Sequence, residues 1–172
     1  TRSLTPQGEV FTLNEIIDPD GNSWTLSWAN GHLAQVTAPA GRWLKISYAV
    51  LSVPGAAASL PPFTVVSQVA ASDGQTVAYA YAFPAGVDYP VLTKVTYPDG
   101  SIASYTYAAP RPGDRLLLTQ ADDPRAVGAV RGRAFQYQTA AGAALGQIAQ
   151  ITARADGAVF QSLAADTRGP RS

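Results

Sequence analysis

Few residues of this chain are suited to chemistry, and they are scattered along it. Its only histidine, His32, follows Asn30 and Gly31 in a turn signature, and no nucleophile elbow or comparable motif surrounds it. A histidine in this setting is most simply an exposed turn residue, so we assign it no catalytic role. The chain has no cysteine, which excludes disulfides, thiolate metal sites and cysteine nucleophiles.

Two groups of acidic residues have spacings that would suit a metal-binding site or an acid–base pair. Asp18, Asp20 and Asn22 place oxygen ligands at alternate positions, as a calcium-binding loop does, but the later acidic ligand of such a loop is missing. Asp122 and Asp123 could act as acid and base, yet adjacent residues in a proline-containing turn point apart. Both groups are better explained as turn residues. We therefore predict no metal site, no cofactor and no enzymatic activity.

Aromatic residues form the most regular set in the sequence. They could form a platform on which a sugar or a peptide stacks, but their spacing of two and their recurrence at equivalent positions favour packing between repeats. The residues assigned to this packing are Trp24, Trp28, Tyr48, Tyr79, Tyr81, Tyr105 and Tyr107. Trp43 falls on the strand face opposite Leu44 and Ile46, so we expect it either to be exposed or to face a lumen.

These aromatic residues belong to a repeat that positions them. In each copy two apolar residues lie three apart, a turn ends in glycine, and apolar or aromatic residues then alternate. The clearest copies are residues 33–48 and 92–107, and the last copy is degraded. Because glycine accepts the positive φ of a tight hairpin turn, the predicted turn residues are Gly21, Gly41, Gly74, Gly100 and Gly157.

Each copy predicts a strand, a tight turn and a second strand. Helical spacing is not sustained anywhere, and the 15 glycines and 13 prolines break the remaining candidates. We predict an all-β fold, an antiparallel β-hairpin repeat array that forms a curved, twisted sheet. The apolar pair three residues apart has opposite parity in a regular strand. Either a bulge near the turn or burial on both faces would reconcile it.

The repeats predict one array over residues 1–172, with no division into domains. Clear repeats cover 13–48 and 63–107, and diverged repeats cover 115–164. The segments 52–62, 109–114 and 139–146 are rich in proline, glycine or alanine and are expected to be inserted loops. A further turn is expected over 122–128.

Composition excludes several classes of partner. Twelve basic and twelve acidic residues cancel, which argues against nucleic acid and anionic membranes, and only 14% of residues are charged. No apolar run is long enough to insert into a membrane as a helix, and no signal peptide is visible. The chain has no methionine and its ends are irregular. We therefore expect it to be a fragment or processed product of a longer protein.

The segments VTAPAGRWLKISY (36–48) and VTYPDGSIASYTY (95–107) resemble YD repeats of the rearrangement-hotspot (Rhs) family. The resemblance covers 13–107 well and 116–160 loosely. In this family, which includes bacterial polymorphic toxins, insecticidal toxin complexes and teneurins, repeat hairpins spiral into a hollow shell. The bacterial shells enclose a toxin domain until delivery.

The resemblance implies that this chain is a structural segment of such a shell. Its partners would be the remaining repeats and the enclosed toxin domain, and it would be secreted or delivered by a bacterial secretion system. Residues 18–21 (DPDG) superficially match the self-cleavage motif of bacterial shells, but they lie inside an ordinary repeat turn, so the protease role is not carried over.

Two alternatives stay open. The runner-up is a cell-surface module that binds carbohydrate or another protein through exposed aromatics and loops, and an enzyme ranks third. Because so few hairpins form only an open arc, self-association through its free sheet edges is a further expectation.

Overall fold

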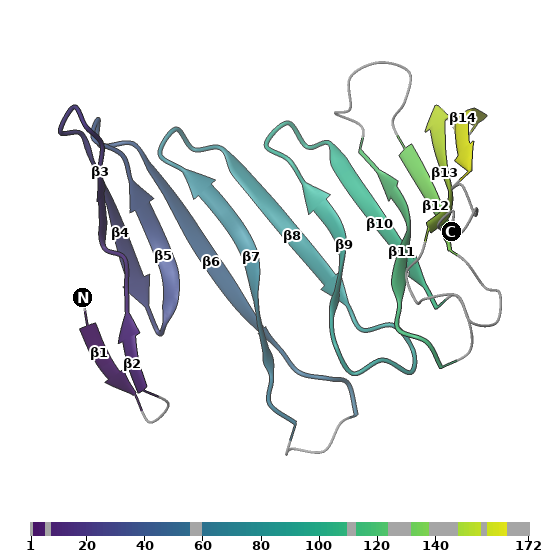
Figure 1. Cartoon of the computed structure of the whole chain (residues 1–172), viewed down its shortest axis with the longest axis horizontal. Coiled ribbons are helices and arrows are strands. Elements are labelled where there is room, and N and C mark those ends of the chain that lie inside the picture. Colours follow the sequence, from purple (N-terminus) through teal and green to yellow (C-terminus); the bar gives the residue numbers. More distant parts are fainter. Residues whose placement is uncertain are drawn as a thin grey trace, which may run out of the picture. The chain divides into compact units, whose positions relative to one another are not determined.

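The computed structural model describes the backbone of residues 2–5, 8–55, 60–109, 113–123, 132–137, 148–155 and 158–164, and the side chains of 12–55, 60–109, 113–123, 132–137 and 148–152. Every regular element in these residues is a β-strand, which confirms the all-β prediction (Figure 1). The described residues include no helix long and apolar enough to cross a membrane.

The chain divides into two compact units, Thr1–Tyr79 with Ala85–Pro90 and Ala80–Pro84 with Val91–Ser172. The first unit holds a separate two-stranded sheet, β1 (Arg2–Thr5) and β2 (Gly8–Phe11). Its larger sheet follows the chain order and comprises β3 (Glu15–Ile17), β4 (Ser23–Ala29), β5 (His32–Thr37), β6 (Trp43–Leu51), β7 (Phe63–Ala71) and the start of β8 (Thr76–Ala82).

The second unit continues with strands that also follow the chain order. They are β9 (Val91–Thr96), β10 (Ile102–Ala108), β11 (Leu117–Asp122), β12 (Gly132–Tyr137), β13 (Ile148–Ala155) and β14 (Ala158–Ala164). All the pairings within the two units are antiparallel. The predicted loop over 52–62 separates β6 from β7. The predicted loop over 139–146 lies outside the described residues.

Four hairpin turns share one geometry. In the turn between β5 and β6, the backbone N–H of Gly41 donates to the carbonyl of Ala38 at 2.9 Å, and the N–H of Ala38 donates to the carbonyl of Arg42 at 2.7 Å. This is a three-residue loop that ends with glycine at positive φ, here 76°. The turns that end in Gly21, Gly74 and Gly100 repeat both bonds, each between adjacent antiparallel strands. Gly157 lies outside the described residues.

Replacing Gly41 by alanine is expected to lower the free energy of unfolding by about 1–2 kcal/mol. A Cβ at this position would meet nothing within 4 Å, so the cost comes from the positive φ alone. Gly41→Asn is the matched control and is expected to lose less, because asparagine tolerates this conformation. Urea unfolding of both variants measures the difference. Equal losses would show that the φ is not the cause.

A β-bulge reconciles the apolar pair that lies three residues apart. In β5, Gln35 pairs with Ser27 and Leu33 pairs with Trp28, which leaves Ala34 as the extra residue. Because a bulge places two residues opposite one, Leu33 and Val36 share a face. The same shift occurs at the equivalent position of three further strands, where the extra residues are Ser67, Thr119 and Ala149. Of the two explanations left open by the sequence, the bulge applies to the apolar pairs of β5, β7 and β13.

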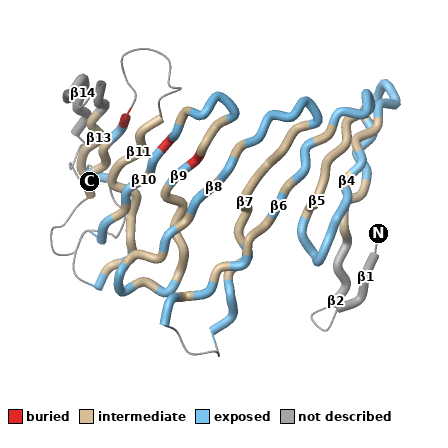
Figure 2. The backbone as a smooth tube through the Cα atoms, turned by 180° about the vertical axis from the view of Figure 1, so that it is seen from behind, coloured by how far each residue is buried: buried red, intermediate tan, exposed pale blue. Residues whose placement is uncertain are grey.

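The bulges gather the apolar side chains of each unit on one face, which we call the apolar face. In the first unit a cross-strand row on this face joins Leu26, Val36, Leu44 and Ala71. Within each unit the strands from β3 onward form a single layer. Among the described hydrophobic residues only Val95 (6% exposed) and Ala103 (0%) are buried, whereas Leu44 remains 49% exposed (Figure 2). A sheet normally buries one face against another layer, so the apolar face lacks its usual cover.

Candidate functional site

His32, the one histidine, lies at the start of β5 and is exposed. Its ring lies against that of Tyr48, with centroids 4.9 Å apart and planes tilted by 32°. This places it in an aromatic contact at the edge of a turn, where Asn30 (φ 50°) and Gly31 (φ 77°) form the predicted connection between β4 and β5. That the chain is no enzyme stays a prediction.

The Asp18 carboxylate organises its own hairpin turn. Its Oδ1 accepts hydrogen bonds from the backbone N–H groups of Asp20 (3.0 Å) and Asn22 (2.9 Å), and its Oδ2 accepts one from Asn22 Nδ2 at 2.8 Å. These bonds lower the pKa of Asp18 below its ordinary value of 3.8, with the Asn22 side chain as the largest cause. The described residues contain no group of three or more side chains that could hold a metal ion. The alternate oxygens are therefore explained by turn formation.

The depressed pKa predicts how this turn responds to acid. We expect Asp18 to titrate below 3.8 in the folded chain, since the folded state favours its ionised form. The stabilising contribution is complete above the unfolded pKa and is lost as the pH falls through the folded one. Carbon-13 NMR of the carboxyl group measures the midpoint. Asn22→Ala removes the largest cause and should move the midpoint up, while an unchanged midpoint would contradict the assignment.

Asp122 and Asp123 serve separate hydrogen bonds, so they form no acid–base pair. Asp122 is the last residue of β11 and not part of the predicted turn; it packs against Gly132 and accepts a hydrogen bond from Gln120 Nε2. Asp123 Oδ2 accepts a bond from the Tyr97 hydroxyl at 3.2 Å. The prediction of a turn is wrong for Asp122, which lies in a strand, whereas Asp123 follows the strand; both side chains are half-buried.

Aromatic side chains of several strands each donate a hydrogen bond to a backbone carbonyl earlier in the chain, and we call each such bond a latch. Two of these side chains, Trp28 and Tyr48, lie seven residues after a turn glycine. Tyr48 donates its hydroxyl to the carbonyl of Leu33 at 2.9 Å, and Trp28 donates its indole Nε1–H to that of Leu13 at 3.0 Å. In the second unit the Tyr137 hydroxyl donates to the carbonyl of Leu118 at 2.7 Å. Burial raises the pKa of Tyr137, which keeps the donating phenol neutral.

The bulge explains why the latch is needed. The pairing of β5 with β6 ends at Gln35 and Lys45, just beyond the bulge at Ala34. The carbonyl of Leu33 lies past this end and takes its hydrogen bond from Tyr48 instead. A polar tip on a large apolar ring is what this position requires. Sequence reasoning predicted the packing but missed the hydrogen bond; the preference for Tyr and Trp over Phe here was the available signal.

The other predicted packing residues lie half-buried on their strands. They are Trp24 on β4, Tyr79 and Tyr81 on β8, and Tyr105 and Tyr107 on β10. Tyr105 lies opposite Ala121 and Tyr107 opposite Leu118, so both rings meet the next repeat. Burial, and to a smaller extent the nearby Tyr105, raises the pKa of Tyr107.

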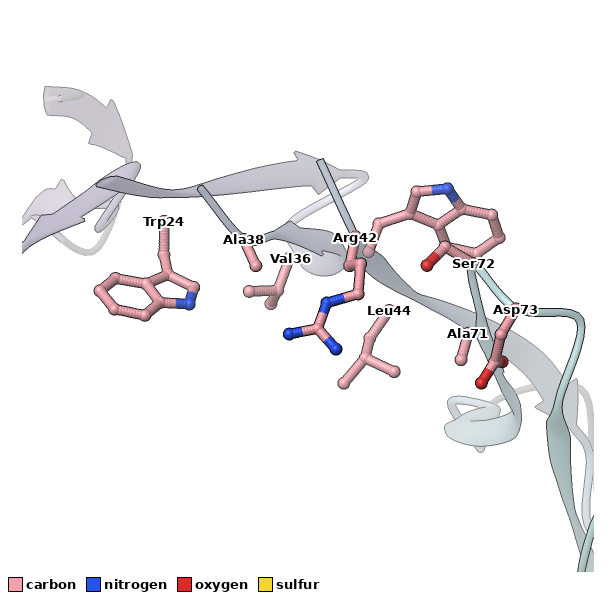
Figure 3. Close-up of a pocket in the computed structure, with 9 residues that line it drawn as sticks. Trp24, Val36, Ala38, Arg42, Leu44, Ala71, Ser72 and Asp73 are labelled. Atoms are coloured by element: carbon pink, nitrogen blue, oxygen red, sulfur yellow. The ribbon is translucent and has the colours of Figure 1, made fainter. Parts of the chain in front are cut away.

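A hollow of about 330 Å³ opens in the first unit near the turn ends of β4 to β7 (Figure 3). Trp24, Val36, Leu44 and Ala71 supply apolar walls, and Trp43, which is half-buried, also lines it. Two charged turn residues complete the lining, Arg42 and Asp73. Neither was singled out from the sequence, because a charge in a hairpin turn is ordinarily solvated.

Compared with known proteins, the sequence matches no family model and no curated protein.

Proposed function

We propose that this chain is a structural, non-catalytic wall segment of an Rhs-type protein, in which a hairpin array encloses a toxin cargo. The observation that carries the proposal is the uncovered apolar face, which leaves Leu44 49% and Trp28 40% exposed. Regular exposed apolar surface of this kind marks a face that meets another polypeptide. A shell wall meets its cargo through such a face.

Enclosure requires no reactive group, only a wall that a protease cannot thread. Within each unit the strands from β3 onward are hydrogen-bonded to their chain neighbours, and latches hold the chain past the bulges at Ala34 and Thr119. A protease needs a segment that opens locally, and opening here breaks both ladder bonds and a latch. The partners would be the remaining repeats and the toxin, and delivery would use a bacterial secretion system.

Limited proteolysis of the whole protein that carries this chain tests the proposal. The enclosed domain is expected to survive in the native protein and to be digested about tenfold faster when Trp28→Ala and Tyr48→Ala together remove two latches. Lys45→Ala, an exposed change on the opposite strand face, is the control and should leave protection intact. Digestion of the domain at the same rate in the native protein and the latch variant would reject enclosure.

A cell-surface binding module is the second candidate, and the hollow with Trp24 on its wall favours it. A carbohydrate-array screen separates the two. Saturable binding to a defined glycan that is lost in Trp24→Ala would support the binding module. Protection of cargo with no glycan bound would support the wall.

A further inference from the structure

In the four hairpin turns described above, the residue that begins the turn lies two positions after the second residue of the apolar pair. Because side chains alternate along a strand, this residue lies on the apolar face. In the turn between β9 and β10 this residue is Tyr97, whose hydroxyl donates to Asp123 at 3.2 Å. The cross-strand pair beside this bond, Val95 and Ala103, contains the most buried hydrophobic residues described. In this repeat an aromatic residue at the turn start bonds a carboxylate, and the pair two residues before it on the same face is the most buried one described.

Two turns of the first unit have alanine at the same position, and there the hollow opens; its remaining turn of this kind begins with Asp18. Ala38 and Ala71 begin the two turns that border it. Figure 3 shows the Arg42 guanidinium extending between Val36 and Leu44, on the side to which the Asp73 carboxylate also points. Asp73 Oδ1 accepts the backbone N–H of Gln75 at 3.0 Å, while Arg42 forms no ion pair with the described residues.

We infer that the hollow binds a tyrosine side chain presented by a partner polypeptide. The ring would lie against Trp24 and Leu44, and its hydroxyl would donate to Asp73 as that of Tyr97 donates to Asp123. The Arg42 guanidinium complements the negative face of an aromatic ring. The volume of the hollow lies at the lower end of the range for ligand pockets, so the hollow has room for one side chain. This inference does not depend on the shell, because the chain alone contains every residue that lines the hollow.

Peptide titration followed by NMR tests the inference. The Trp24 indole N–H signal, assigned with Trp24→Phe, should shift saturably with acetyl-Gly-Tyr-Gly-amide. The phenylalanine peptide should bind about tenfold more weakly, since it cannot donate to the carboxylate. Ala38→Tyr places a ring in the hollow, as Tyr97 does in its own repeat, and should abolish binding.

Matched substitutions separate the site from general charge effects. Arg42→Gln should weaken tyrosine binding about threefold, whereas Lys45→Gln, the same charge change on the opposite strand face, should leave it unchanged. Absence of saturable binding, equal affinity for the two peptides, or undiminished binding by Ala38→Tyr would each overturn the inference. So would a Trp24 signal that changes with protein concentration alone, because a second copy would then occupy the hollow.

Discussion

Replacing Ala103 by aspartate is expected to lower the free energy of unfolding by about 3 kcal/mol or more. Ala103 is 0% exposed and pairs across strands with Val95, so a carboxylate there loses its hydration. Urea unfolding followed by tyrosine fluorescence measures the loss.

The neighbouring residue provides a matched control. Ser104 is exposed and, as the next residue of β10, points to the opposite face, so Ser104→Asp should change stability by less than about 0.5 kcal/mol. Similar losses for the two substitutions would show that the apolar face of this repeat is as open to water as its other face. That result would contradict the burial on which the further inference depends.

Tyr48→Ala is expected to cost about 2–3 kcal/mol, and Tyr48→Phe about 1 kcal/mol. Phenylalanine keeps the ring that lies against His32 and loses only the bond to the carbonyl of Leu33, whereas alanine loses both. The difference between the two variants isolates ring packing from the latch. Equilibrium urea unfolding of each variant gives the values.

A second tyrosine tests whether the hydroxyl matters only at the latch position. Tyr79 lies five residues after its turn glycine and makes no side-chain hydrogen bond with the described residues. Tyr79→Phe should therefore be close to neutral. A loss equal to that of Tyr48→Phe would mean that the latch bond contributes nothing specific.

The strands and turns were predictable because their causes are local. Glycine at positive φ and alternating apolar residues act within a few positions of the chain, so the hairpins at Gly21, Gly41, Gly74 and Gly100 lie where the sequence predicted them. The bulge carried a local signal too. A small residue followed by glutamine stands between the paired apolar residues of β5, β7, β11 and β13.

The site was less predictable, because its groups meet across strands. Asp122 and Asp123 are adjacent in sequence, yet one packs against Gly132 on β12 and the other reaches Tyr97 beyond β9. The latch from Tyr48 to Leu33 spans 15 residues. Sequence spacing predicts which face a side chain takes but not which carbonyl or carboxylate it will meet there.

The sequence by itself determined the all-β class, the hairpin turns and the side chains that share a face, since these follow from backbone sterics and a period of two. Only the tertiary structure decided that Ala38 and Ala71 leave a hollow beside Arg42 and Asp73, while Tyr97 at the equivalent turn position bonds Asp123. The physical reason is that a hollow belongs to several strands at once. Its shape depends on how their side chains pack together, which no single strand's pattern contains.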